Sequence, residues 1–355
     1  MHCLTDKNLS EKNGGIMKFL TILLIVTNII TANAFSSNLR KVTLFDSKRI
    51  MSDFVQSLYN DGEYLWIGTY NGLSLYSNGR VIKNLYNDYN IVKSNLFSKK
   101  TGNSFLIDNR INDIEKISSK IYIATDGGLS VYDYEENEWS SIDTNNSILE
   151  SDYIQSIASE GTRLWIGTAD SGLYVWDTSG GNWQKIGATG PQGSIFGSFD
   201  GKNITRVVSA PEKNLLFVGT MDKGLFVSQD GRWRNITTKY PSNSFLPSDR
   251  ILSMHFFRDK LYIGTNRGLV IYDNDNFTLI NERHGLRNAV ILSINDDGEH
   301  IFMGTARGLY KLNQGEGTPA RMLEGENFRI LDIAVYNKKL FLATQNFGVA
   351  VSNYQ

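Results

Sequence analysis

One short pattern recurs seven times along the 355 residues and constrains the fold more than any other feature. Each copy reads apolar, aromatic, apolar, Gly or Ala, Thr, and a Gly followed by an apolar residue comes three or four positions after the Thr. The Gly or Ala positions are Gly68, Ala124, Gly167, Gly219, Gly264, Gly304 and Ala343, spaced by 56, 43, 52, 45, 40 and 39 residues. Self-similarity at this period predicts an array of equivalent structural units.

Each unit carries three further strand-like segments. An inner segment precedes the pattern, as in Ile111 and Ile114, and starts 13 residues before the Gly or Ala in six copies and 15 before it in the fourth. A third segment follows the second Gly, and a fourth is often led by an aromatic such as Trp139 or Trp233. Four short strands are the content of one propeller blade. The predicted fold class is therefore all-β, a seven-bladed β-propeller with four antiparallel strands per blade.

The two ends of the repeat array predict how the ring closes. The seventh unit stops after its third strand, at Gln355, while the strand-like segment 41–45 stands alone before the first unit. We expect this N-terminal strand to complete the last blade, because closure removes exposed sheet edges. Residues 35–355 would then form a single propeller domain.

An export signal precedes the array. Met17-Lys18, an apolar run over 19–30 and Ala32-Asn33-Ala34 are typical of a secretory signal peptide, so we expect residues 17–34 to be cleaved after Ala34. Residues 1–16 are interpreted as an extension ahead of the true bacterial start at Met17. The prediction is a periplasmic or secreted protein with no membrane span in the mature chain; an uncleaved anchor is the alternative.

Charge and cysteine content narrow the function classes. The formal net charge is −1, which argues against nucleic acid as a partner. The one cysteine, Cys3, lies in the N-terminal extension, so we expect neither a disulfide framework nor a Cys-based zinc site in the mature chain.

The stretches 65–73 and 261–269 resemble the hallmark of the two-component regulator propeller repeat family, Leu-Trp-Ile-Gly-Thr-x-x-Gly-Leu. The resemblance covers about residues 41–355, in seven copies. In that family such propellers commonly form the periplasmic ligand-sensing part of bacterial histidine kinases, often linked to polysaccharide sensing. The resemblance therefore implies a ligand-binding propeller, and the sequence shows no kinase domain or β-sandwich after the blades. Its motif is structural and implies no catalytic residue.

Candidate binding residues lie in the turns between second and third strands and in the loops between blades, which we expect on one face of the ring. Arginines gather in the later blades and aspartates in the earlier ones. Arginine forks suit carboxylate or sulfate groups, which predicts a site for an anionic glycan or an acidic peptide; a solvated surface of balanced charge is the alternative. The candidates are Asn71, Asp126, Asp170, Asp222, Arg250, Arg267, His284, Arg287 and Arg307.

Two other groups of residues are candidates. Long loops over 87–109, 187–203 and 239–249 carry aromatics suited to stacking on sugars: Tyr86, Tyr89, Phe97, Phe105, Phe196, Phe199, Tyr240 and Phe245. On the inner segments, Asp113, Arg206 and Asp332 interrupt a series of serines. They either line the channel or act as paired, hydrogen-bonded spacers.

Catalysis has weaker support in the sequence. His284, near Arg283 and Arg287, is the best candidate for a general base, as a polysaccharide lyase would need, and Asp126, Asp170 and Asp222 are candidate carboxylates for a glycosidase. No nucleophile elbow, phosphate loop, zinc spacing or complete calcium loop appears, so no cofactor or metal is expected. We expect a non-catalytic module that binds a glycan fragment or an envelope protein. The alternatives are a lyase or hydrolase of an anionic polysaccharide and an envelope-assembly scaffold.

Overall fold

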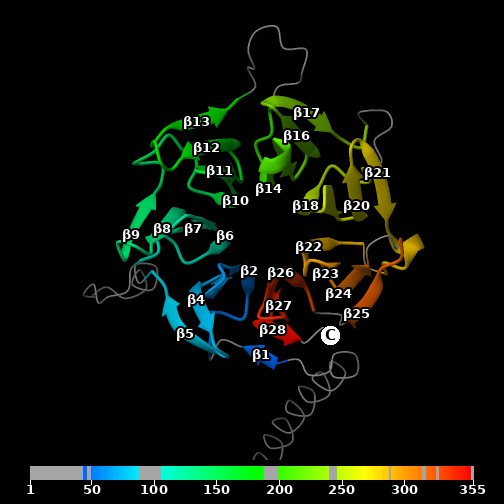
Figure 1. The fold of residues 1–355 in the computed structure, drawn as a ribbon, viewed down its shortest axis with the longest axis horizontal. Helices are drawn as coiled ribbons and strands as arrows, with labels where there is room; N and C mark the ends of the chain where they lie inside the picture. Colours follow the sequence, from blue (N-terminus) through cyan, green and yellow to red (C-terminus); the bar gives the residue numbers. More distant parts are fainter. Residues whose placement is uncertain are drawn as a thin grey trace, which may run out of the picture.

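Seven four-stranded antiparallel sheets surround a central opening (Figure 1). The computed structural model describes residues 43–45, 49–87, 105–187, 199–239, 246–287, 289–313, 317–324 and 328–352. Within these ranges the only helical elements are two short turns, η1 (Pro211–Lys213) and η2 (Glu282–His284). The predicted all-β seven-bladed propeller is confirmed, while the expected signal peptide and N-terminal extension lie outside the described residues.

Every blade runs from an inner strand at the channel to an outer strand at the rim. The innermost strands are β2 (Val55–Asn60), β6 (Ile111–Ile117), β10 (Ile154–Glu160), β14 (Ile204–Ala210), β18 (Ile251–Phe257), β22 (Ile291–Asp296) and β26 (Ile330–Tyr336). The second strands are β3 (Leu65–Thr69), β7 (Lys120–Thr125), β11 (Arg163–Thr168), β15 (Leu215–Thr220), β19 (Lys260–Thr265), β23 (His300–Thr305) and β27 (Lys339–Thr344). The third strands are β4 (Gly72–Ser77), β8 (Gly128–Asp133), β12 (Leu173–Asp177), β16 (Leu225–Gln229), β20 (Gly268–Asp273), β24 (Gly308–Asn313) and β28 (Val349–Ser352). The outer strands are β5 (Arg80–Leu85), β9 (Glu138–Ile142), β13 (Trp183–Ile186), β17 (Arg232–Ile236), β21 (Asn276–Ile280), β25 (Ala320–Glu324) and β1 (Thr43–Phe45).

The outer strand of blade 7 comes from the other end of the chain. β1 pairs antiparallel with β28, with Thr43 opposite Val351 and Phe45 opposite Val349. The sheet order of this blade is therefore β1-β28-β27-β26, and its four strands join residues more than 300 positions apart in sequence.

The threonine and second glycine of the repeated pattern build the turn between the second and third strands. In blade 1 the Thr69 hydroxyl donates to the carbonyl of Gly72 at 2.7 Å and accepts from the N–H of Asn71 at 3.1 Å. Gly72 has a φ of +126°, and a Cβ there would lie 2.6 Å from the Leu85 carbonyl oxygen. Only glycine fits this position without strain. The same threonine-to-glycine hydrogen bond recurs in all seven blades.

The core lies between neighbouring blades. Trp66, at the aromatic position of blade 1, is 1% exposed and packs with Ile111 and Ile114 of blade 2. Next to it, Gly68 leaves room for the Ile111 side chain, whose Cγ2 would lie 2.6 Å from a Cβ on that glycine. Trp165 likewise packs with the cluster shared by blades 3 and 4. The repeated pattern thus specifies how each blade packs on the next.

Candidate ligand-binding face

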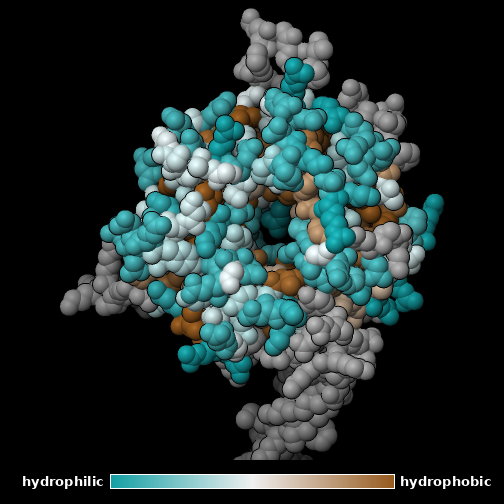
Figure 2. Space-filling model, viewed as in Figure 1, coloured by the Kyte–Doolittle hydropathy of each residue, from teal (hydrophilic) through white to brown (hydrophobic). Residues whose placement is uncertain are grey.

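The turns between second and third strands lie beside the residues that lead into the inner strands. The Tyr70 N–H donates to the Phe54 carbonyl at 3.0 Å, and the Ala169 N–H donates to the Tyr153 carbonyl at 2.9 Å. Equivalent bonds in blades 4, 6 and 7 place both sets of residues at the same end of their blades. They therefore share one face, which we call the rim face. The centre of the ring is visibly hollow in the space-filling view (Figure 2).

Seven residues surround the channel at this end, one directly before each inner strand: Phe54, Arg110, Tyr153, Asn203, Arg250, Val290 and Arg329. Sequence reasoning named Arg250 as a site residue but did not single out Arg110 or Tyr153. The repeat does indicate these positions, because each lies directly before the first residue of an inner segment.

Four of the predicted arginines are exposed on blades 5 and 6: Arg250, Arg267, Arg287 and Arg307. The Arg267 guanidinium donates to the Pro247 carbonyl at 3.3 Å. Described arginines with ion pairs include Arg110, Arg163 and Arg234, but none of those four pairs with a carboxylate that the structure describes. We call these four side chains the arginine sector. They leave their positive charge without a protein counter-charge among the described residues.

The predicted aspartates do not form one group. Asp126 pairs with Arg110 at 2.9 Å and accepts from the Asn112 side chain at 2.8 Å, so its charge is neutralised. Asp170 and Asp222 are exposed in the turns of blades 3 and 4, and Asp170 accepts from the Ser171 hydroxyl at 3.1 Å. Asn71 is also exposed, in the turn of blade 1. Among the described residues no cluster of three or more His, Cys, Asp or Glu side chains is placed to hold a metal ion.

The histidines take part in local structure. His284 closes η2, because its Nδ1 lies 3.2 Å from the Asn281 N–H while the Asn281 side chain accepts from the Arg283 N–H at 3.0 Å. His255 Nε2 lies 2.6 Å from Asp296 Oδ2, joining blades 5 and 6. The ring that was the best candidate for a general base therefore caps a turn.

Two aspartates of the inner strands bond across blade boundaries. Asp332 of blade 7 accepts from the Leu58 N–H of blade 1 at 2.8 Å. Asp113 of blade 2 accepts from the Ser156 hydroxyl at 2.8 Å and the Ile157 N–H at 3.0 Å, both in blade 3. These contacts favour the interpretation of hydrogen-bonded spacers.

The same two carboxyl groups are weaker acids than an ordinary aspartate. Burial raises the pKa of Asp332 to about 6 and also raises the pKa of Asp113, while the positive charge of Arg206 lowers both values in part. Arg206, the third residue that interrupts the serine series, thus acts on both acids through its charge.

Three of the loop aromatics chosen from the sequence lie within the described residues, and none of the three is exposed. Phe199 is buried against Phe226 and Trp233, and Phe105 stacks on Trp139 at 5.7 Å, so the expectation of exposed rings was wrong for these two. Tyr86 is half-buried. Tyr89, Phe97, Phe196, Tyr240 and Phe245 lie outside the described residues. Among the residues that the structure describes, the exposed aromatics on the rim face are instead Tyr70, Tyr153 and Phe347, which are 49%, 40% and 36% exposed.

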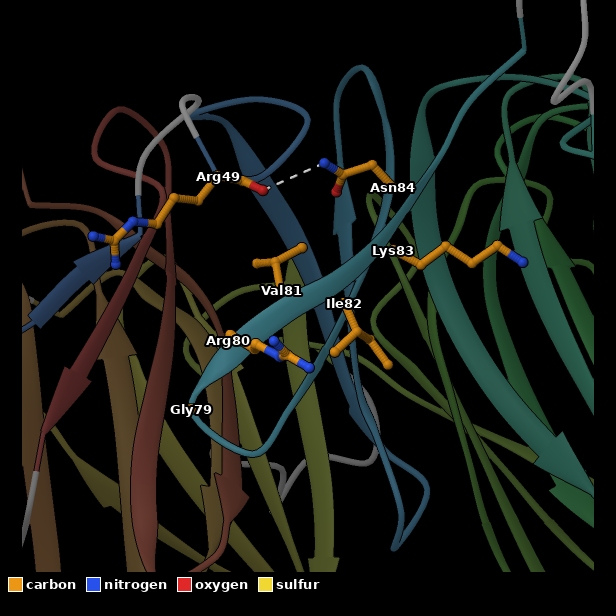
Figure 3. A pocket seen from close by; sticks show the side chains of 7 residues that line it. All are labelled: Arg49, Gly79, Arg80, Val81, Ile82, Lys83 and Asn84. Carbon is orange, nitrogen blue, oxygen red and sulfur yellow. Dashed lines mark hydrogen bonds between the residues drawn. The ribbon is translucent and has the colours of Figure 1, made fainter.

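Two hollows lie away from all the predicted site residues. One of about 350 Å³ runs along the outer strand β5 of blade 1, where Figure 3 shows Arg80 and Ile82 on the strand and Arg49 and Lys83 pointing in opposite directions. Another, of about 160 Å³, lies between blades 4 and 5 beside the Arg234–Asp275 ion pair.

The chain is similar in structure to two extracellular domains from B. thetaiotaomicron. The domain of BT3049, described as a hybrid two-component system, gives a TM-score of 0.68 at 19% identity over 88% of this chain and 42% of that one. The domain of BT4673, described as a one-component system, gives 0.65 at 19% identity over 90% of this chain and 40% of that one. The computationally designed protein Ika8 gives 0.53 at 12% identity over 84% of this chain and 95% of that one.

These likenesses establish the class of protein at the level of fold. The chain is a seven-bladed β-propeller, and the expected resemblance to propellers of two-component regulators is confirmed in that its structural neighbours include extracellular domains of such systems. It spans about two fifths of the length of those domains. No family model matches the sequence, and no curated protein matches it. None of the described helices is long and apolar enough to cross a membrane.

Proposed function

We propose that the protein is an exported, non-catalytic binding propeller that takes an anionic ligand on its rim face. The observation that carries the proposal is the arginine sector, in which Arg250, Arg267, Arg287 and Arg307 are exposed without a described carboxylate partner. Guanidinium groups in this state can form bidentate bonds to carboxylate or sulfate without first breaking an internal ion pair. The ligand class is a glycan fragment bearing such groups, or an acidic segment of an envelope protein.

The proposed location is the periplasm or the extracellular space. The basic start, apolar run and Ala32-Asn33-Ala34 of residues 17–34 support cleavage after Ala34, which would leave residues 35–355 as one propeller domain. Structural neighbours that are extracellular domains support the same assignment.

Binding is favoured over catalysis by what the candidate catalytic groups do. Of the candidate carboxylates for a glycosidase, Asp126 is neutralised by Arg110, which leaves Asp170 and Asp222, exposed in the turns of blades 3 and 4. A lyase needs a base, and the His284 ring closes the η2 turn.

The test removes two arginines from the rim face. A control variant removes two arginines elsewhere, so that both variants change the net charge by the same amount. Arg267→Ala/Arg307→Ala is compared with Arg80→Ala/Arg163→Ala, whose exposed arginines begin strands at hairpins away from the rim face. Titration calorimetry uses oligogalacturonate, a chondroitin sulfate oligosaccharide and a poly-glutamate peptide. We expect at least one probe to bind the parent protein, and the rim variant to weaken it by about tenfold or more, as loss of two charge-assisted contacts implies.

The control variant should stay within about twofold of the parent protein, since distant surface charges are screened. If no probe binds, or if the rim variant binds like the parent, the arginine sector is not a ligand site.

A further inference from the structure

We propose that a second binding site, for an uncharged sugar ring, lies on the same rim face but in other blades than the arginine sector. It is formed by Tyr70, Arg110, Asp126 and Tyr153. The four residues come from three consecutive blades. Tyr70 lies in the turn after β3 of blade 1, Arg110 and Asp126 belong to blade 2, and Tyr153 directly precedes β10 of blade 3. The inference extends the proposed binding role of the rim face to residues separate from the arginine sector.

The Arg110 guanidinium holds the four side chains together. Its carbon lies 4.7 Å from the centroid of the Tyr70 ring, and its Nη1 lies 2.9 Å from Asp126 Oδ2 and 3.4 Å from the Tyr153 hydroxyl. A cation over an aromatic face and an ion pair on the same guanidinium restrict its rotamers. The site is therefore organised before any ligand arrives, which lowers the entropic cost of binding.

A buried amide network fixes the site from behind. Asn112, which is 2% exposed, donates to Asp126 Oδ1 and to the Ile154 carbonyl, both at 2.8 Å. Gln56 in turn donates to Asn112 Oδ1 at 2.8 Å. Phe54 supports the Tyr70 ring at a centroid distance of 5.3 Å. The network connects the inner strands of blades 1, 2 and 3, so the spacing of the two tyrosines follows from the packing of the blades.

The two tyrosine rings remain exposed although neighbouring aromatics are packed. Tyr70 is 49% exposed and Tyr153 is 40% exposed, whereas Trp66 and Tyr122 in the adjoining strands are 1% exposed. Exposed apolar surface beside a few placed polar groups is the usual composition of a ligand site.

The charge of the site selects the ligand. Arg110 and Asp126 neutralise each other, so the site offers an acidic group no net attraction and a nucleic acid no basic track. It does place donors beside an acceptor, and sugar hydroxyls both donate and accept. The apolar C–H face of a pyranose can lie on an aromatic ring. An uncharged sugar is the ligand class that uses both features.

The experiment screens uncharged oligosaccharides against the full chain. Maltohexaose, cellohexaose, xylohexaose and mannohexaose are tested by saturation-transfer NMR and calorimetry against the parent protein, Tyr70→Ala, Tyr153→Ala and the control Phe347→Ala. Phe347 is an exposed aromatic of the same face, in the turn of blade 7. We expect one oligosaccharide to bind and each tyrosine variant to weaken it by about tenfold, the loss of one stacked ring, with Phe347→Ala within about twofold.

Added salt separates this site from the arginine sector. Binding of the uncharged sugar should change little between low and high NaCl, because no net charge is neutralised. Melting curves of the variants check that each remains folded. If none of the four oligosaccharides binds, or if the tyrosine variants bind like the parent, the inference is wrong. In that case, loss of acidic-probe binding in Arg267→Ala/Arg307→Ala would still support the proposed function. If Tyr70→Ala or Tyr153→Ala instead weakens binding of the acidic peptide, the assignment of this site to an uncharged sugar is also wrong.

Discussion

At the scale of single residues, the Gly or Ala of each repeat depends on the inner-strand residue that pairs with it. Serine or arginine pairs with glycine, as in Ser293 opposite Gly304, whereas aspartate pairs with alanine, as in Asp332 opposite Ala343. The Ser293 hydroxyl donates to the Ile330 carbonyl of blade 7 at 3.3 Å and would clash with a Cβ on Gly304. Asp332 turns toward the next blade and bonds to Leu58, which leaves room for the methyl group of alanine.

Gly304→Ala should therefore destabilise the protein by about 1–3 kcal/mol, the usual cost of overpacking a filled core. The new methyl group would clash with the Ser293 hydroxyl and would also lie 2.6 Å from Ile330 Cγ2. Urea unfolding measures the difference. The matched control is Gly317→Ala, where nothing lies within 4 Å of the added Cβ, and its midpoint should not move. Equal stability of the two variants would show that the glycine is not required for packing.

Residue roles were only partly predictable from the sequence. The Thr and Gly of the turns, and the packing role of Trp66, follow from a local pattern and from the period of the repeat. The partner of Asp126 does not, because Arg110 and Asp126 are brought together by pairing between β6 and β7. Phe199 looked available in a long loop but fills a gap beside Phe226 and Trp233.

At the scale of elements, several inner strands are joined to the next by side-chain bonds to backbone. The pairing of the inner and second strands shifts register near the start of every inner strand, as between Ile154 and Ser156. In three blades the N–H after this point bonds to a side chain of the preceding blade: Leu58 to Asp332, Ile157 to Asp113 and Val207 to Ser156. Such bonds satisfy buried donors that would otherwise cost stability.

The burial of Asp332 between β26 and β2 should make stability depend on pH. The pKa of Asp332 in the fold is about 6, above its ordinary value of 3.8, so the folded state binds the proton more tightly than the unfolded chain. Its contribution is therefore complete below about pH 4 and is lost as the pH rises through 6. We expect stability to fall by on the order of 1–2 kcal/mol from this group between pH 4.5 and 7.5.

Asp332→Asn should flatten part of that slope in urea titrations at several pH values. Asp113 and Glu115 remain in the variant, and burial raises the pKa of both, that of Glu115 to about 7, so the slope should shrink without vanishing. Superimposable pH profiles of variant and parent would contradict the assignment.

At the scale of the whole molecule, the ring depends on a sheet made from both ends of the described chain. Deleting residues 35–46 removes β1 and exposes the edge of β28, whose residues Val349–Val351 pair with it. We expect a broad, less cooperative melt at lower temperature than that of a chain starting at Phe35, measured by calorimetry. An unchanged cooperative transition would show that β1 is dispensable.

The architecture of the molecule was more predictable than its surface. Seven copies of a pattern, six of them with an offset of 13 residues between the inner segment and the Gly or Ala, define blade number and strand order, because turns and packing are encoded within each repeat. The side chains at the mouth of the channel vary from blade to blade, and Phe54, Arg110 and Tyr153 occupy equivalent positions with different chemistry. The side chains that determine the chemistry of this face are therefore identified by their contacts in the structure.

A scaffold of seven near-identical blades would offer a ligand seven interchangeable orientations. The rim face removes that degeneracy, because blades 1 to 3 present tyrosines around a neutralised ion pair and blades 5 and 6 present arginines without described counter-charges. A chain molecule acidic at one end and uncharged at the other would lie across the channel in a single direction, and the propeller would distinguish the two ends of such a molecule.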